Sequence, residues 1–107
     1  MMTSTTDYIA GFKVVRNFGV VDAFTCNAVG AAGNIMGGLQ ALTTGGKLGA
    51  YSDLNESSRK EAFHKMCEAA GRMSANAVIG VRIQTQGFEQ GVLEVLCYGT
   101  AVLVEPQ

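Results

Sequence analysis

The sequence is poor in charge and contains no segment that could span a bilayer as a helix. Only 16% of its 107 residues are Asp, Glu, Lys or Arg, against about 25% in a typical soluble domain. No run of Lys and Arg exceeds two residues, and the net charge is −1, which argues against a nucleic-acid-binding surface. No apolar run reaches the roughly 18 residues that a membrane helix requires, so we expect no membrane partner.

Targeting signals and cysteine pairs are also missing. The stretch Met1–Asp7 lacks the basic start and the apolar run of a signal peptide, so we expect a cytoplasmic protein. Cys26, Cys67 and Cys97 form no Cys-x-x-Cys pair, which favours small buried side chains in a reducing compartment. Residues 1–7 are small and polar, and they predict a frayed start to a single domain over residues 1–107.

What the chain does have is a strand near its C-terminus that is apolar on both faces, over Val92–Val104. Side chains alternate between the two faces of a strand, so both faces need cover. Leaving one face wet would expose four or five large apolar side chains, a cost of about 6–15 kcal/mol. That cost is comparable to the whole net stability of a small domain. The pattern therefore predicts cover by a second layer or by a neighbouring copy.

The remaining periodicities predict an α+β subunit with the element order β-β-α-α-β-β and an antiparallel sheet. A break at Arg16-Asn17 separates the first two strands, and Gly19 marks a bulge. A glycine-dense helix would end at Gly45-Gly46. The expected segments are strands near 8–15 and 18–26, helices near 31–43 and 52–74, and a hairpin of 77–85 with 92–104.

The helix near 52–74 has one apolar side and one charged side, with Ser52 or Asn55 as its expected cap. Two oppositely charged pairs at spacing i,i+4 support its outer side. The expected pairs are Glu61–Lys65 and Glu68–Arg72, and the expected apolar side comprises Phe63, Met66, Cys67, Ala70, Met73 and Ser74. We expect this helix to cover one face of the sheet.

A metal site is the first candidate for chemistry. His64 and Cys67 are three residues apart on the long helix, a spacing that can place two ligands on one transition metal such as copper, zinc or nickel. Further ligands would have to come from Cys26 and Cys97, through folding or through the symmetry of a ring.

The ordinary alternative is a histidine at the flank of the helix that pairs with Glu68 or Lys60, beside a core cysteine. One histidine and three cysteines would also allow a Cys–His nucleophile, but no local signature accompanies them. We therefore expect a protein that is not an enzyme.

A second candidate site is a glycine-rich loop with one lysine, made of Gly45, Gly46, Lys47, Gly49 and Tyr51. Exposed amides beside a lysine can form a small anion-binding nest. The loop is not a P-loop, because the first glycine and the hydroxyl after the lysine are both missing. Helix capping with tight packing is the alternative interpretation.

Six short motifs, in order and at matching spacing, resemble the YbjQ-like family of small proteins labelled as heavy-metal binding. They are Gly19–Val21, Gly33–Ile35, Gly45–Tyr51, Ala62–Phe63, Asn76–Val81 and Gly99–Val102. The resemblance covers nearly the whole chain and implies a dodecin-like subunit that assembles into a homopentameric ring. It agrees with the two-faced strand, but the number five comes from the resemblance alone.

The chain departs from the family where carboxylates are common. Ser52 follows the tyrosine of the Gly-Ala-Tyr motif, Ser74–Asn76 replaces Gly-Ala-Asp, and Arg82 and Gln84 replace aspartates. These losses argue against binding of hard cations at those positions. We expect a homo-oligomeric protein, pentameric by resemblance, that binds a heavy metal or small ligand at subunit interfaces. The alternative is a structural or regulatory interaction scaffold without bound metal.

Overall fold

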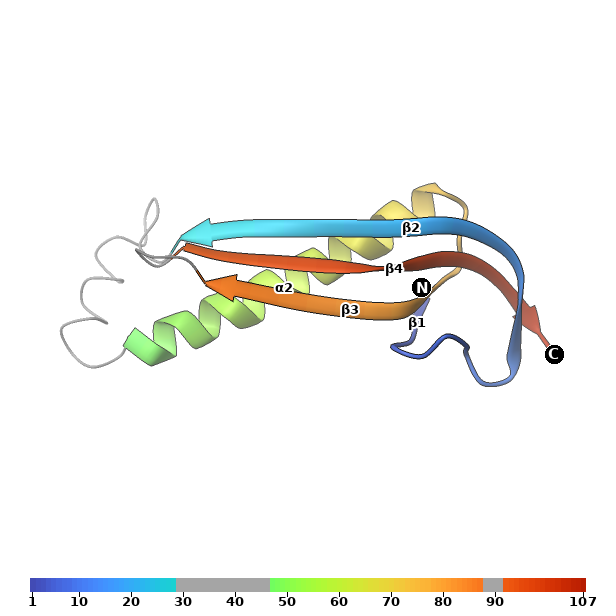
Figure 1. Cartoon of the computed structure of the whole chain (residues 1–107), viewed down its shortest axis with the longest axis horizontal. Coiled ribbons are helices and arrows are strands. Elements are labelled where there is room, and N and C mark those ends of the chain that lie inside the picture. The colour runs from blue at the N-terminus through green and yellow to red at the C-terminus, as the bar shows by residue number, and fades with distance from the viewer. Residues whose placement is uncertain (29–46, 88–91) are drawn as a thin grey trace.

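In the computed structural model, which describes residues 1–28, 47–87 and 92–107, one helix packs across one face of a four-stranded sheet (Figure 1). The sheet order is β1-β3-β4-β2. The elements are β1 (Met2–Thr3), β2 (Phe12–Ala28), α2 (Lys47–Arg72), β3 (Ala77–Gly87) and β4 (Val92–Pro106). The α+β class is confirmed. The order β-β-α-α-β-β is not found in the described part, and the helix expected near 31–43 lies outside it.

A single long strand, β2, replaces the two N-terminal strands that the sequence predicts. It pairs antiparallel with β4 along its whole length. The break expected at Arg16-Asn17 becomes two register shifts, one between Val14 and Arg16 and one between Asn17 and Gly19. Gly19 has a φ of 98°, which confirms the predicted irregularity there, since glycine adopts this conformation without steric cost. Because β4 pairs with it throughout, β2 remains a single strand despite these register shifts.

The N-terminal segment is part of the sheet. Residues 1–7, for which composition predicts a frayed start, contain β1, which pairs in parallel with β3 through Met2 opposite Ala77. The sheet is therefore mixed, where the sequence predicts an antiparallel one. The amide of Ser4 donates to the carbonyl of Val78 (3.0 Å), and the amide of Val81 donates to the carbonyl of Ser4 (3.0 Å). These bonds use backbone groups, so side-chain composition could not reveal them.

Helix α2 confirms the predicted long helix but begins earlier, so Ser52 and Asn55 lie inside it and do not cap it. At its end, the amide of Ser74 donates to the carbonyl of Gly71 (3.0 Å), and the amide of Ala75 donates to that of Ala70 (3.1 Å). With Ser74 at φ 72°, this is a Schellman motif, a common way to end a helix. In the described part of the chain, no helix is long and apolar enough to cross a membrane.

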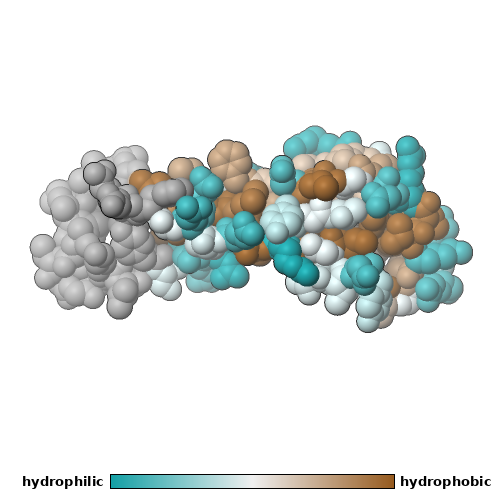
Figure 2. Space-filling model, viewed as in Figure 1, coloured by the Kyte–Doolittle hydropathy of each residue, from teal (hydrophilic) through white to brown (hydrophobic). Residues whose placement is uncertain are grey.

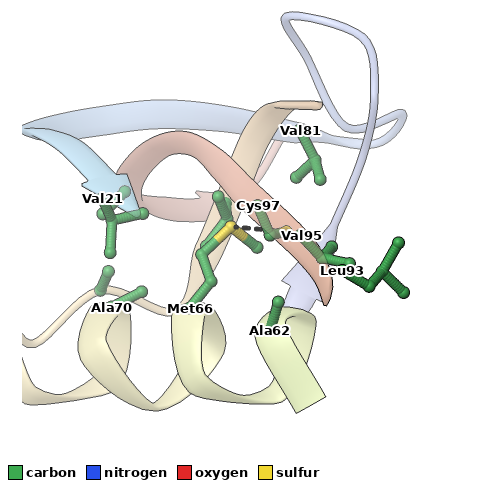
Figure 3. Close-up of a cluster of buried hydrophobic side chains, with 11 residues drawn as sticks. Val21, Ala62, Met66, Ala70, Val81, Leu93, Val95 and Cys97 are labelled. Carbon is green, nitrogen blue, oxygen red and sulfur yellow. Dashed lines mark hydrogen bonds between the residues drawn. The ribbon is translucent and has the colours of Figure 1, made fainter. Parts of the chain in front are cut away.

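The core lies between α2 and the sheet (Figure 3). Its fully buried side chains come from the inner side of the helix and from alternate positions of β4 and its neighbours; they include Ala62, Met66, Ala70, Val78, Val95, Cys97 and Ala101. On the opposite face, a smaller cluster forms under the N-terminal segment, from Ala77, Val102 and Val104 with Met2, Ile9, Phe12 and Ile79. Within the described residues, α2 covers one face of the sheet, and the N-terminal segment covers the other face only at one end.

Candidate functional site

The structure places His64 and Cys67 in different surroundings. The His64 side chain is 74% exposed, and its Nε2 lies 2.5 Å from Oε1 of Glu68. Cys67 is half-buried and packs against the core cluster. This is the alternative that the sequence leaves open, a histidine paired on the helix surface beside a core cysteine. In the described residues, no three His, Cys, Asp or Glu side chains come together to hold a metal ion.

The buried sulfur atoms form a packing contact. Sγ of Cys97 lies 3.5 Å from Sδ of Met66, in the centre of the core (Figure 3). Burial, together with the neighbouring Cys67, raises the pKa of the Cys97 thiol. Burial also raises the pKa of Cys67, although the N-terminal ammonium opposes that change. Metal ligation needs the thiolate, so burial disfavours the ligating form of both thiols. The metal site at His64 and Cys67 stays a prediction.

The second candidate, the glycine-rich loop, lies only partly in the described structure. Lys47, Gly49 and Tyr51 belong to the first turns of α2, where the sequence predicts a loop. Gly45 and Gly46 lie outside the described residues. Anion binding by this segment therefore stays a prediction.

An apolar stripe along β2 and β4 lies on the sheet face away from α2, and we call it the open face. It comprises Val20, Phe24, Val92, Leu96 and Tyr98. Val20 is 75% exposed and Phe24 is 62% exposed, and Phe24 pairs across the strands with Leu96. Figure 2 shows apolar side chains along this side of the molecule. The sequence predicted two apolar faces on β4 but did not assign the matching face of β2, because the register shifts in β2 hide its alternation.

The open face also carries polar groups that ligands can use. Cys26 is exposed and lies opposite Glu94 in the pairing of β2 with β4. Asp22 lies opposite Tyr98 in the same ladder. A thiol and a carboxylate therefore share one face of the sheet in each chain, and the sequence alone could not bring these distant residues together.

A separate cleft of about 280 Å³ lies on the other side of the sheet, between α2 and β3. It is lined by Glu56, Arg59, Lys60, Phe63 and Ile83. The sequence analysis did not predict this cleft. The sequence pattern that could have indicated it is the i,i+4 spacing of Arg59 and Phe63, which places a cation and an aromatic ring side by side on a helix.

Relatives of this chain are small proteins of similar length. The chain is 42% identical over 105 residues to a UPF0145 protein from Chromobacterium violaceum, covering 98% of this chain and 89% of that one. It is 38% identical over 100 residues to a UPF0145 protein from Thermoplasma acidophilum, covering 94% and 83%. Both alignments run through the helix and the sheet.

The fold is similar to a crystal structure of a DUF74-family protein from Pediococcus pentosaceus, with a TM-score of 0.69 over 98% of each chain at 20% sequence identity. A family model described as "Putative heavy-metal-binding" matches residues 1–105. Together with the motifs that run from Gly19 to Val102, this match over nearly the whole length shows that the chain belongs to the YbjQ family.

Proposed function

We propose that this protein is a homo-oligomeric binding protein in which copies of the chain cover one another's open faces. The observation that carries the proposal is the exposure of Val20 (75%) and Phe24 (62%) on a sheet face that the described residues cover only at one end. Each such side chain gains about 1.5–3 kcal/mol when it leaves water. Repeated over several residues, this gain is large enough to hold subunits together.

Two sheet edges offer the means of forming a ring. β2 lies at one edge of the sheet. At the other side, β3 pairs with β1 at Ala77 and Val78, and the N-terminal segment bonds to it as far as Val81. Both strands run antiparallel to β4, so β2 and β3 point in the same direction. Pairing β2 of one copy with the free part of β3 of the next would extend the sheet in a head-to-tail manner. Heterologous contacts of this kind form a ring when the rotation between neighbouring subunits closes, and an open filament when it does not. The family resemblance favours a ring of five subunits.

Ligand binding between subunits follows from the chemistry of the open face. The described part of one chain has no cluster of metal ligands, but a ring would repeat Cys26 and Glu94 once per subunit. Thiolate and carboxylate donors suit zinc, and thiolate also suits copper. A heavy metal or a small ligand bound at this place would be held by several subunits together.

The decisive measurement is the native particle mass by light scattering at micromolar concentration. We expect a mass several times that of the 11.2 kDa chain, with five copies favoured by the resemblance. A monodisperse monomer that melts cooperatively would overturn the proposal. Elemental analysis after incubation with copper, zinc or nickel then tests binding, with Cys26→Ser as the variant that loses metal and His64→Ala as its matched control.

The alternative function is an interaction scaffold without metal. The contact of His64 with Glu68 on the helix surface favours it, because the only histidine of the sequence already has a carboxylate partner. The loss of carboxylates at Arg82 and Gln84 points in the same direction. An oligomer that takes up no metal at micromolar concentration, and that retains one macromolecular partner in pull-down experiments, would support this alternative.

A further inference from the structure

The cleft between α2 and β3 has an apolar floor. Phe63 reaches it from the helix and is half-buried, while Ile83 reaches it from β3 and is 37% exposed. The volume of about 280 Å³ is at the small end of the range for small-molecule sites. A ligand of this size would be comparable to one aromatic ring with a short chain.

The rim of the cleft carries more positive than negative charge. Lys60 is engaged with Glu56 through Nζ and Oε1 at 3.0 Å. Arg59, which lies between them in sequence, makes no ion pair within residues 1–28, 47–87 and 92–107. A guanidinium offers two parallel N–H groups that match the two oxygens of a carboxylate. Arg59 therefore offers a positive charge at the rim of the cleft, and a carboxylate is its preferred partner.

The helical part of the apolar floor and the cation at the rim are neighbours on α2. Arg59 and Phe63 are one turn apart, at i and i+4, so they lie on the same side of α2. A ligand that places its apolar body on Phe63 and Ile83 would bring an attached carboxylate to Arg59. From this arrangement we propose that the cleft binds a small carboxylate with an aromatic or branched apolar body. All five lining residues come from one chain, so each chain carries a complete site.

The test uses the full chain labelled with ¹⁵N and titrated with 3-phenylpropionate, followed by amide chemical shifts. We expect saturable shifts that cluster at residues 56–63 and 83. The neutral analogue 3-phenylpropan-1-ol should bind about tenfold or more weakly, because it lacks the charge-assisted hydrogen bonds. Arg59→Gln should weaken binding of the carboxylate by a similar factor, and it should leave binding of the alcohol unchanged.

The control is Arg72→Gln, which removes an exposed arginine from the same helix at its far end and should bind 3-phenylpropionate like the native chain. Phe63→Leu keeps an apolar floor and should weaken both probes equally, and its amide spectrum reports whether the fold is intact. The proposal is overturned by equal affinity for acid and alcohol. It is also overturned by shifts that map to the open face around Phe24, or by no shifts at the cleft.

Discussion

The two faces of the sheet are built from the same strands but differ in how far their side chains are exposed to solvent. On the face under α2, Val95 and Cys97 are completely buried, as is Met66 of the helix. On the open face, Val20 and Phe24 of β2 are mostly exposed. Neighbouring positions along one strand differ in this way because side chains alternate, and because the described helix covers only one side.

The difference between the faces shows what kind of cover the chain can provide for itself. α2 brings small residues, Ala62 and Ala70, against the sheet, and both are completely buried. The N-terminal segment covers the other face with Met2, Ile9 and Phe12, but only above Ala77, Val102 and Val104. The length of β2 and β4 exceeds the reach of that segment. Cover for the remainder would have to come from outside the described chain.

The largest change in stability is expected at the centre of the face that α2 covers. Met66→Ala should lower the free energy of unfolding by about 2–5 kcal/mol, because it removes a fully buried side chain and leaves a cavity. Urea denaturation followed by circular dichroism measures the change. Lys65→Ala, one residue away on the exposed side, should cost less than about 1 kcal/mol. Equal costs would contradict the assignment of the core.

The next largest effect is expected at a close backbone approach within the sheet. A Cβ on Gly99 would lie 2.7 Å from Cγ1 of Val78 and 2.9 Å from the carbonyl oxygen of Ile79. Gly99→Ala should therefore destabilise the fold by about 1–3 kcal/mol. Gly87→Ala is the matched control, since nothing lies within 4 Å of its added Cβ. Thermal melting of both variants distinguishes them, and an unchanged melting temperature for Gly99→Ala would contradict the close approach.

On the open face, a substitution should change assembly far more than the subunit fold. Phe24→Ser should change the stability of the dissociated subunit by only about 0.5 kcal/mol, as for other surface positions. If neighbouring copies cover this face, the same change should reduce the native mass measured by light scattering. Tyr8→Ser, which alters an aromatic residue that is 61% exposed elsewhere, should leave the mass unchanged. A loss of fold in Phe24→Ser would mean that both faces belong to one core.

The smallest effect is expected on the outer side of the helix. His64→Ala removes a contact with Glu68 between side chains that are 74% and 52% exposed, and exposed pairs of this kind contribute little net energy. The melting temperature should stay within about 1 °C of the native value. Metal content measured in the same preparation should also be unchanged. A loss of bound metal in this variant would instead support His64 as a metal ligand.

Strong local patterns predicted the long helix and the C-terminal hairpin. The pair Glu61–Lys65 forms as expected, with 3.1 Å between Oε1 and Nζ, because residues four apart on a helix are neighbours whatever the rest of the chain does. Strand β1 could not be predicted, because Met2 pairs with Ala77 through the backbone and the two residues are far apart in the sequence. The pairing of Cys26 with Glu94 depends on a register that two bulges shift. The cleft at Phe63 and Ile83 likewise needs two distant elements in contact.

The pairing of the first strand has a consequence for the order of folding. Met2 and Thr3 bind Ala77 and Val78, so the beginning of the chain must wait during synthesis until residue 78 has left the ribosome. The helix and the C-terminal hairpin contain mainly local contacts and can form without it, whereas closing such a long loop is slow. The N-terminal segment is therefore expected to dock last. Until it does, Val102 and Val104 lack the cover of Met2, Ile9 and Phe12, and exposed apolar surface of this kind favours aggregation.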